Sequence, residues 1–593
     1  MTEPQLTDNA QKVLEARYLR RDEDGHVAET PDELFRRVAG AVAAAEEEFG
    51  DGDARGHWEE RFHDRLARLE FLPNSPTLMN AGTPMRQLSA CFVLPVEDDM
   101  AGIFESLRQM ALIQQSGGGT GFSFSKLRPQ GDLVGSTGGR ASGPVGFMRI
   151  FDAATENIRQ GRKRRGANMA VLRADHPDVR EFIHAKRSEE SLRNFNLSVA
   201  APDEFLAAAR DGRPWTLKNP RTGEPGERLS AGELLREIVE AAWATGDPGL
   251  LFLDAVNRAN PTPRLGAIEA TNPCGEVPLL PYEACNLGSI NLSRMVRGQG
   301  DSAAIDWEKL GDVARLGVRF LDNVIEVSRW PSPQINSMVG ANRKIGLGLM
   351  GFAEMLIQLG VPYDSDGANT LAGEVMQFVA EQARAASRDL AAERGTFPSW
   401  KQSVYAERNL PLRNATQTSI APTGTISIIA GTSASIEPLF ALVYHRSVAL
   451  EGASLPEVNP LFLEHARRQG FYSDEVVEQL NAGRALGEIE GVPEGARELF
   501  RTALEIEPED HLRIQAAFQA HVDNAVSKTV NLPESATADD VGAAYETAWN
   551  LGLKGVTIFR YGSKSRQVLN VGAEESPQEH EHYARCDPGE CRV

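Results

Sequence analysis

The residues best suited to chemistry in this sequence are its cysteines, of which there are only five in 593 residues. Cys91 lies in the apolar run "QLSACFVLP", Cys274 and Cys285 lie in "NPCGEVPLLPYEAC", and Cys586 and Cys591 lie in the polar C-terminal stretch. Any one of them alone is more often a structural or incidental residue. The arrangement of all five favours a thiol–disulfide relay, in which an internal disulfide forms during turnover and a tethered pair then exchanges with it.

Two glycine-containing segments are candidates for contact with a ligand. In "QQSGGGTGFSFSKLRP", Gly117, Gly118, Gly119 and Gly121 permit close approach to something flat or anionic, although a tight helix-to-strand turn would use the same residues. In "APTGTISIIAG", residues 422–426 offer N–H groups and hydroxyls to a phosphate if a helix begins there. A plain Thr/Gly turn between strands is the alternative for this second segment.

Two charged or metal-ligand-rich segments remain ambiguous. The basic run "RQGRKRRGANM" is either a solvated loop or a clamp for a nucleoside triphosphate, because Arg side chains match phosphate oxygens. The tail contains His580 and His582 near its two cysteines, but their spacing fits no common zinc module. We therefore predict no metal ligands in this chain.

These groups need a large scaffold to position them. Residues 1–70 have apolar positions at helical spacing and are predicted to form a helical N-terminal region. Residues 71–570 alternate amphipathic helices, such as 102–115, with short apolar runs including "SACFVLP", "NFNLSVA", "GSINLS" and "GTISIIAG", the texture of an α/β fold. Residues 571–593 are polar and acidic and are predicted to be a mobile tail.

The composition narrows the class of protein. A net charge of −21 argues against a nucleic-acid polymer as the ligand. The sequence has no apolar run long enough to span a membrane, and its charged N-terminus lacks the apolar core of a secretion signal. These features favour a cytoplasmic protein that has no membrane partner.

Nine segments, in this order, resemble those of ribonucleotide reductase catalytic subunits, and most closely the adenosylcobalamin-dependent class II type. They are "FLPNSPTLMNAG", "QLSACFVLP", "SGGGTGFSFSKLRP", "RRGANMAVLRADHPD", "TNPCGEVPL", "EACNLGSINL", "RKIGLGLMGFAEML", "SIAPTGTISIIAG" and "KGVTIFRYGSKSR". The resemblance covers nearly the whole chain. It implies a ten-stranded α/β barrel made of two five-stranded parallel halves, with a central finger loop that would be the segment around "NPCGE".

The resemblance also implies catalytic roles. Cys274 would carry the radical, Glu276 would act as the base at the substrate 3′-hydroxyl, and Asn272 would orient the substrate. Cys91 and Cys285 would form the reducing dithiol. The tail cysteines Cys586 and Cys591 would then re-reduce it with electrons from a thioredoxin-like donor.

Binding sites and partners follow from the same resemblance, which implies a ribonucleotide substrate, a deoxynucleoside triphosphate effector and a homodimer formed through the helix before the glycine cluster. The predicted substrate-binding residues are Ser75, Ala90, Cys91, Gly119, Asn272, Pro273, Cys274, Gly275, Glu276, Pro422, Thr423, Gly424, Thr425 and Ile426. The predicted effector-binding residues are Asp98, Arg128, Arg162 and Arg165.

The choice of class depends on residues near the end of the barrel. Class I large subunits relay a radical through an adjacent tyrosine pair, whereas this chain has Phe559 and Arg560 there, followed by a single Tyr561. Class III enzymes carry a glycyl-radical motif and a four-cysteine zinc site, and neither is visible. Class II is therefore predicted; a class I large subunit with a separate radical-bearing subunit and a non-catalytic nucleotide sensor are the alternatives. Whether di- or triphosphates are the substrate is left open, although diphosphates suit a dimeric enzyme of this type.

Overall fold

The structure is a computed structural model, and two compact units make up the chain. The first unit comprises Met1–Pro438 and Ala503–Lys564, and the second is built on Leu439–Thr502. The residues that the structure describes are 4–50, 52–135, 138–160, 164–188, 190–447 and 454–563. No helix among these described residues is long and apolar enough to cross a membrane.

The first unit begins with helices, as predicted. The second helix starts with a capping box, in which the Thr30 side chain accepts from the Glu33 N–H and the Glu33 carboxylate accepts from the Thr30 N–H. Apolar residues at helical spacing are buried along its inner face. The helices of this region are α1 (Asp8–Arg17), α2 (Pro31–Ala43), the short 3₁₀ helix η1 (Ala44–Glu48) and α3 (Gly52–Ala67).

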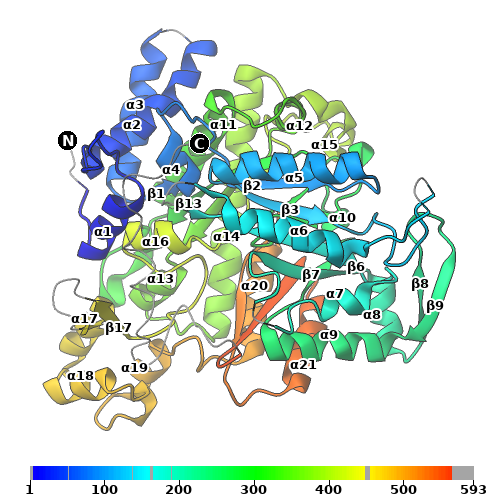
Figure 1. Cartoon of the computed structure of the whole chain (residues 1–593). Helices are drawn as coiled ribbons and strands as arrows, with labels where there is room; N and C mark the ends of the chain where they lie inside the picture. Colours follow the sequence, from blue (N-terminus) through cyan, green and yellow to red (C-terminus); the bar gives the residue numbers. More distant parts are fainter. Residues whose placement is uncertain are drawn as a thin grey trace. The chain divides into compact units, whose positions relative to one another are not determined.

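A ten-stranded sheet follows and forms the core of the first unit (Figure 1). Five neighbouring strands are all parallel, and they form one half of a barrel. These strands are β2 (Cys91–Pro95), β3 (Gly119–Ser123), β6 (Asn168–Arg173), β7 (Phe195–Ala201) and β10 (Gly249–Phe252).

The second half of the barrel is also parallel. Its strands are β13 (Ala284–Asn291), β16 (Ile345–Met350), β19 (Thr529–Leu532) and β20 (Gly555–Arg560). The gap between β16 and β19 is closed by an extended segment, through the parallel bridges Leu347↔Thr418 and Ile420↔Val526. The halves meet in antiparallel pairs, β13 with β2 and β10 with β20, and β1 (Phe71–Pro73) pairs antiparallel with β13. The ten-stranded α/β barrel is therefore confirmed: one half has five parallel strands, and the other has four parallel strands and this extended segment.

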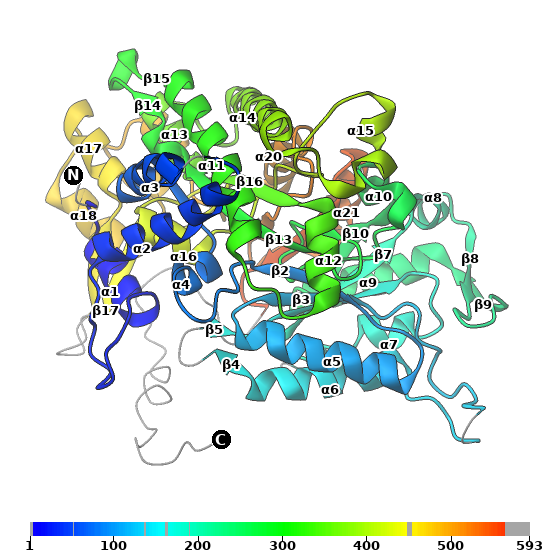
Figure 2. The same cartoon turned by 90° about the horizontal axis from the view of Figure 1, so that it is seen from above.

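Helices connect the parallel strands, as parallel pairing requires. Helix α5 (Met100–Gln115) lies beside α6 (Gly143–Asn157) in both views (Figure 2), and the predicted stripe of α5 is buried at Ile103, Met110 and Gln114. The other helices of the unit are α4 (Ser75–Asn80), α7 (Val179–Ile183), α8 (Asp203–Arg210), α9 (Ala231–Thr245), α10 (Leu253–Arg258), α11 (Trp307–Val327), α12 (Pro333–Asn342), α13 (Phe352–Leu359), α14 (Asp366–Arg394), α15 (Val404–Glu407), α16 (Gly424–Ala430), α20 (Pro508–Gln519) and α21 (Ala538–Asn550).

Among the described residues of the first unit, four two-stranded hairpins are not part of the ten-stranded sheet. They are β4–β5 (Arg159–Gln160 and Arg164–Arg165), β8–β9 (Pro214–Lys218 and Pro225–Ser230), β11–β12 (Ala270–Thr271 and Pro278–Leu279) and β14–β15 (Val296–Arg297 and Ala304–Ile305).

One element differs from its prediction. The run "GTISIIA", one of the short apolar runs expected to be strand-like, forms helix α16, which is the helix start that phosphate binding at residues 422–426 requires. Its apolar residues Ile426, Ile429 and Ala430 recur at intervals of three and four and are buried, whereas Ile428 is exposed. Thr423 precedes the helix in the left-handed conformation, with a φ of 51°, and turns the chain into it.

A buried ion network binds the N-terminal helices to the barrel helices. The Glu46 carboxylate in η1 lies 2.8 Å from the Arg319 guanidinium of α11 and 2.7 Å from that of Arg394 in α14. Asp322 of α11, fully buried, pairs with Arg343 at 2.8 Å and with Arg394 at 3.2 Å. Removing one partner from such a network leaves an uncompensated buried charge and costs about 3–5 kcal/mol.

The second unit is small and has its own aromatic cluster. The rings of Phe462 and Phe500 meet edge to face, with centroids 5.2 Å apart, and Phe471 packs on Phe462 at 6.0 Å. Its elements are β17 (Val443–Ser447), β18 (Ser454–Val458), α17 (Pro460–Gln469), α18 (Asp474–Asn481) and α19 (Glu494–Leu499).

Candidate active site

The segment "NPCGE" is the tip of the β11–β12 hairpin, which we call the finger loop (residues 270–279). Two bonds across the tip fix its shape: the Gly275 N–H donates to the Asn272 carbonyl at 3.1 Å, and the Val277 N–H donates to Oδ1 of Asn272 at 3.0 Å. Gly275 has a φ of 84°, a conformation that side-chain-bearing residues rarely adopt. Asn272 is therefore part of the loop's own framework.

The glycine cluster makes room for this loop. A Cβ on Gly121 would lie 1.8 Å from the Thr271 carbonyl oxygen, and one on Gly119 would lie 2.9 Å from Cγ of Pro273. The close approach expected for these glycines is thus an approach to the finger loop. Gly118 does not face the finger loop, because a Cβ on it would meet the side chains of Phe92 and Ile113.

The loop is held by hydrogen bonds from both halves of the barrel. The Glu276 carbonyl accepts from the Ala525 N–H at 2.9 Å and from Oγ of Ser419 at 2.8 Å, and Nδ2 of Asn196 donates to the Pro273 carbonyl at 2.8 Å. Sequence reasoning missed these three positions. Ser419 lies in the quoted segment "SIAPTGTISIIAG", which was a usable signal, and Asn196 lies in the quoted strand-like run "NFNLSVA", whereas no quoted segment contains Ala525.

The two cysteines predicted to form a dithiol are brought together. Cys91 of β2 and Cys285 of β13 are direct partners in the antiparallel ladder. Directly opposed residues in such a ladder have Cα atoms about 4.5–5.5 Å apart, which lies within the range for a disulfide. Both are present as thiols and both are buried. A disulfide between them needs only side-chain rotation and small backbone adjustment.

The surroundings of these two sulfurs differ. Sγ of Cys91 accepts from Nδ2 of Asn272 at 3.1 Å and donates to Oε1 of Glu276 at 3.8 Å, so it faces the finger loop. Sγ of Cys285 donates to the Asn286 carbonyl at 3.3 Å. Burial raises the pKa of the Cys285 thiol, and the neighbouring carboxylates of Glu276 and Glu283 add to the shift, while Lys344 opposes it. Cys285 is therefore held in the protonated form.

Cys274 stands apart from this pair because it is exposed at the loop tip, while Asn272 and Glu276 are 2% exposed. A Cβ on the adjacent Gly275 would meet no heavy atom within 4 Å. The tip therefore has open space beside the exposed Cys274.

The predicted phosphate-binding residues come from two helix starts. Ser75 is the first residue of α4, and its Oγ lies 2.7 Å from the hydroxyl of Tyr18. Helix α16 begins at Gly424, after Pro422 and Thr423, and Oγ1 of Thr423 accepts from the Ser435 N–H at 2.7 Å. The first N–H groups of a helix have no partner within it. Both views show α4 and α16 in the same region (Figures 1 and 2).

Of the remaining predicted substrate contacts, Ala90 and Gly119 lie at the starts of strands and two lie in a helix. The Gly119 N–H donates to the Ala90 carbonyl at 2.8 Å, next to Cys91 and the finger loop. Thr425 and Ile426 lie in the first turn of α16.

Two of the four predicted effector residues contact each other. Nε of Arg128 lies 2.9 Å from Oδ2 of Asp98, just before α5. Arg165 is in the short strand β5, while Arg162 lies outside the described residues. The redox-tail cysteines Cys586 and Cys591, together with the rest of the predicted tail 571–593, also lie outside the described residues.

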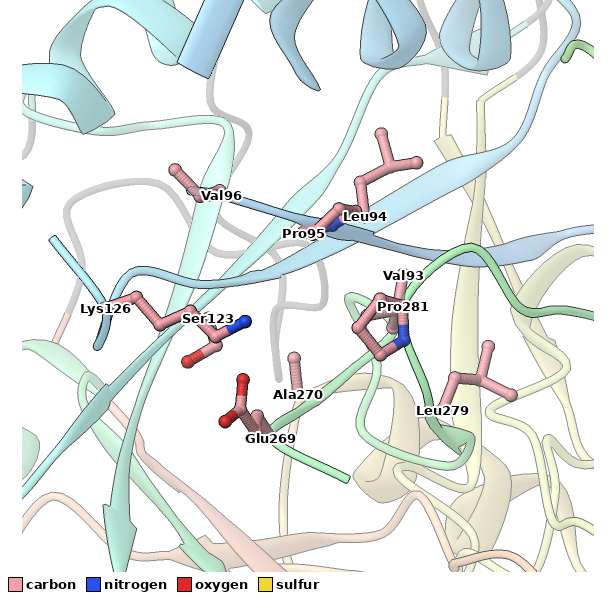
Figure 3. A pocket seen from close by; sticks show the side chains of 10 residues that line it. All are labelled: Val93, Leu94, Pro95, Val96, Ser123, Lys126, Glu269, Ala270, Leu279 and Pro281. Atoms are coloured by element: carbon pink, nitrogen blue, oxygen red, sulfur yellow. The ribbon is translucent and has the colours of Figure 1, made fainter. Parts of the chain in front are cut away.

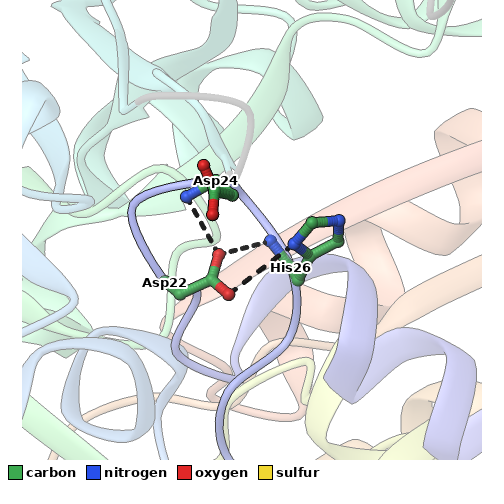
Figure 4. A group of neighbouring side chains, drawn as sticks. All are labelled: Asp22, Asp24 and His26. Carbon is green, nitrogen blue, oxygen red and sulfur yellow. Dashed lines mark hydrogen bonds and ion pairs between the residues drawn. The ribbon is translucent and has the colours of Figure 1, made fainter.

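A small cavity and an exposed acidic turn lie outside this site. A cavity between strand β2 and the stem of the finger loop has a volume of about 10 Å³, too small for a nucleotide (Figure 3). An exposed group of Asp22, Asp24 and His26 is explained by a turn, in which Oδ1 of Asp22 accepts from the N–H groups of Asp24 and His26 (Figure 4). Neither feature adds a functional residue.

Strand β20 explains a residue that the sequence left uninterpreted. The Arg560 guanidinium lies 4.3 Å from the centroid of the Trp243 ring, and its Nε donates to the Trp243 carbonyl at 3.1 Å. Its Nη1 also donates to the Glu534 carbonyl at 3.2 Å. Arg560 therefore anchors the end of β20 to α9, and this is a structural role.

Comparisons with known proteins agree with this geometry. The profile of the family described as "Ribonucleotide reductase, barrel domain" matches residues 89–412 and 407–559, and that described as "Ribonucleotide reductase, all-alpha domain" matches residues 4–86. The chain belongs to the ribonucleotide reductase family.

The chain is similar to individual proteins of this family. The chain is 53% identical to the vitamin B12-dependent ribonucleoside-diphosphate reductase of Mycobacterium tuberculosis, over 96% of this chain and 80% of that protein. It is 47% identical to the protein of the same name from Thermoplasma acidophilum, over 97% of this chain and 82% of that one. The alpha subunit of the class Id ribonucleotide reductase of Actinobacillus ureae shares the fold, with a TM-score of 0.77, 22% identity and coverage of 94% and 97% of the two chains.

Proposed function

We propose that this protein reduces ribonucleoside diphosphates to 2′-deoxyribonucleoside diphosphates by thiyl-radical chemistry that adenosylcobalamin starts, and so supplies precursors of DNA. The observation that carries the proposal is the arrangement at the finger loop. An exposed Cys274 lies in the same loop as the buried Glu276, and the buried loop residues contact one member of the paired thiols Cys91 and Cys285.

Each residue type suits one step of this reaction. The Cys274 sulfur removes hydrogen from C3′ of the ribose, which activates the neighbouring 2′ position. Glu276 accepts the proton of the 3′-hydroxyl, and it is buried, so water does not compete for it. Asn272 orients the substrate hydroxyls and also fixes the loop through Val277.

The dithiol completes the reduction. As the 2′-hydroxyl departs as water, Cys91 and Cys285 supply two electrons and two protons overall, one of the protons to the departing water, and they become a disulfide. Their facing positions in the ladder support this pairing, and the raised pKa of Cys285 keeps its proton available. Cys586 and Cys591 are proposed to re-reduce the disulfide, with electrons from a thioredoxin-like protein.

The open loop tip fits adenosylcobalamin. When bound, that cofactor supplies the initial radical by homolysis of its cobalt–carbon bond. Cys274 is exposed and Gly275 has open space above it, as direct access by a bulky group requires. Residues 559 and 560 are Phe and Arg, so a tyrosine-pair relay from a second subunit is lacking in β20, and Arg560 is committed to Trp243. Radical generation by adenosylcobalamin is therefore favoured over the class I alternative, in which a separate subunit supplies the radical.

The family supports a nucleotide substrate and allosteric nucleotide effectors, and the finer assignments are proposals. The substrate diphosphate would bind Ser75, the Ala90–Cys91 backbone, Gly119 and the start of α16. A deoxynucleoside triphosphate would bind near Asp98 and Arg128, with the basic loop at Arg162 and Arg165.

We also propose a homodimer formed through α5 and α6. Exposed apolar side chains on these helices support this interface: Met100, Phe104 and Leu112 on α5, and Ile150 on α6. Sedimentation of the purified chain should give twice the monomer mass, and replacing Phe104 by Glu should shift it toward the monomer.

Replacement of Cys274 tests the catalytic proposal. Cys274→Ser should abolish deoxynucleotide formation while nucleotide binding, measured by calorimetry, stays within about twofold. Cys285→Ser is the matched control, because it should lose repeated turnover through failure of the reductant rather than of radical generation. Retained reduction in Cys274→Ser would refute the radical role.

A further inference from the structure

A buried ion pair next to Cys285 is not used by the proposed chemistry. Nζ of Lys344 lies 2.6 Å from Oε2 of Glu283, and both side chains are 1% exposed. Glu283 also accepts from Nδ2 of Asn342 at 2.5 Å and from the Leu280 N–H at 2.7 Å. Burying two charges this completely is costly, and apolar residues of similar volume often stabilise a fold as well or better. Stability alone is therefore a weak explanation for this pair.

Strand register places Lys344 level with Cys285. In the parallel pair of β13 and β16, Asn286 is the partner of Ile345. Cys285 immediately precedes Asn286 and Lys344 immediately precedes Ile345, so Cys285 and Lys344 lie side by side. A Cβ on Gly346, two residues after Lys344, would lie 3.5 Å from Sγ of Cys285. Residues two apart in a strand point to the same face.

Three charged groups act on the Cys285 sulfur. Lys344 precedes β16 and favours the thiolate, whereas Glu283, which precedes β13, and Glu276 of the finger loop disfavour it. Lys344 is thus the cationic group in this set. Its position matters whenever Cys285 has to leave as a thiolate.

The two sulfurs of the dithiol face different surroundings. Cys91 contacts Asn272 and Glu276, so it lies on the finger-loop side, where the substrate is proposed to bind. Cys285 donates to the Asn286 carbonyl, and the charges described above act on it through space. A thiol that enters through the substrate site therefore meets Cys91 first.

We propose that Lys344 is a positioning residue for re-reduction of the Cys91–Cys285 disulfide: an incoming thiolate attacks the more accessible Cys91, and the Lys344 ammonium stabilises Cys285 as it leaves, which offsets the burial and the two carboxylates that disfavour its thiolate. This inference rests on the proposed function, because it concerns the same dithiol. Glu283 holds the Lys344 ammonium in place and limits its effect.

The exchange balances in two steps. The thiolate of an external dithiol forms a bond to Sγ of Cys91, the Cys91–Cys285 bond breaks, and its electron pair leaves on Cys285 beside Lys344. The second thiolate of the same reagent then attacks the external sulfur of the mixed disulfide, and Cys91 leaves as a thiolate. The reagent loses two electrons and becomes a disulfide, and its two protons end on Cys91 and Cys285.

The first test needs no substitution and no turnover. The full-length protein is oxidised with diamide, treated with the monothiol 2-mercaptoethanol, quenched by alkylation and mapped by peptide mass spectrometry. We expect the mercaptoethanol adduct on Cys91 and the alkylated thiol on Cys285. An adduct mainly on Cys285 would overturn the proposal.

The second test separates an electrostatic role from a structural one. The rate of disulfide reduction by dithiothreitol is measured across pH for Lys344→Met, Lys344→Arg and Glu283→Gln. A leaving thiol whose pKa rises by one to two units leaves about three- to tenfold more slowly. We therefore expect that slowing in Lys344→Met, a rate within about twofold of wild type in Lys344→Arg, and no slowing in Glu283→Gln.

The two substitutions that break the ion pair make the result decisive. Equal slowing in Lys344→Met and Glu283→Gln would indicate a structural role, and an unchanged rate in Lys344→Met would refute an electrostatic one. If Lys344→Met does not fold, the position of the mercaptoethanol adduct in the wild-type protein tests the proposal: an adduct on Cys91 supports it and an adduct on Cys285 overturns it. Failure of the wild-type protein to form deoxynucleotides would refute the proposed function but leave both thiol measurements interpretable.

Discussion

Gly121→Ala is predicted to displace the finger loop without touching a reacting group. Gly121 lies in the middle of β3, and its missing side chain leaves room for the loop backbone. A Cβ there would lie 1.8 Å from the Thr271 carbonyl oxygen, 2.8 Å from the Thr271 carbonyl carbon and 3.4 Å from the Asn272 Cα. The atoms it meets are backbone, so rotation of a side chain cannot relieve the contact.

The size of the displacement sets the expected effect. Real Cβ contacts are essentially never shorter than 3.0 Å, so the loop or the strand must move by about 1.2 Å. A misplacement of about 1 Å in a catalytic group costs about 100-fold in rate. Overpacking of this kind also lowers the free energy of unfolding by about 1–3 kcal/mol. We therefore expect a folded protein whose kcat is lower by about 100-fold.

The assay is formation of deoxynucleotides with adenosylcobalamin and dithiothreitol, alongside thermal unfolding. Gly226→Ala is the matched control, because Gly226 also lies in a strand, β9, and its Cβ would sit at an ordinary 3.5 Å from the Leu217 carbonyl. It should retain full activity. Wild-type activity in a folded Gly121→Ala protein would refute the view that β3 positions the finger loop.

Three further predictions concern one residue that holds the finger loop and two residues that stabilise the fold. Asn196→Ala removes the bond to the Pro273 carbonyl and should lower kcat about five- to tenfold in steady-state kinetics, with KM little changed; an unchanged kcat would remove Asn196 from the support. Arg560→Met should lower the free energy of unfolding by about 1 kcal/mol through loss of the Trp243 contact, without lowering turnover; lost turnover at unchanged stability would indicate a radical route through β20. Burial lowers the pKa of Lys554 from 10.5 to about 8, so its contribution to stability is lost as pH falls through 8 and present above 10.5. Urea unfolding should therefore show that wild type gains up to about 3 kcal/mol relative to Lys554→Met between these pH values, and parallel pH profiles would contradict this.

Short-range signals in the sequence predict much of the fold. The helical N-terminal region, the strand at Cys91 and the helix before the glycine cluster follow from apolar periodicity, and the structure confirms them. Helix α16 was missed because "GTISIIA" is rich in β-branched residues, and the burial of one helical face overrides that preference. The two halves of the barrel were predicted only from the resemblance to ribonucleotide reductases, because the order of strands in a sheet is not encoded in local sequence.

In the candidate active site too, proximity along the sequence was predictable, whereas long-range contacts were not. Cys274, Asn272 and Glu276 are adjacent in the sequence, so their proximity was predictable. The facing of Cys91 and Cys285 depends on the register of two strands far apart in the chain, and residue types do not reveal it. Asn196 and Lys344 lie in the quoted segments "NFNLSVA" and "RKIGLGLMGFAEML", but each acts through a long-range contact that its residue type does not reveal.

Cofactor dependence is the most direct test of the central claim. The purified single chain is assayed with each of the four ribonucleotides, as diphosphates and as triphosphates, with dithiothreitol and with or without adenosylcobalamin. We predict that diphosphates are reduced when adenosylcobalamin is present and that no product forms without it. No product with adenosylcobalamin, or product only when a separate radical-bearing subunit is added, would contradict the account.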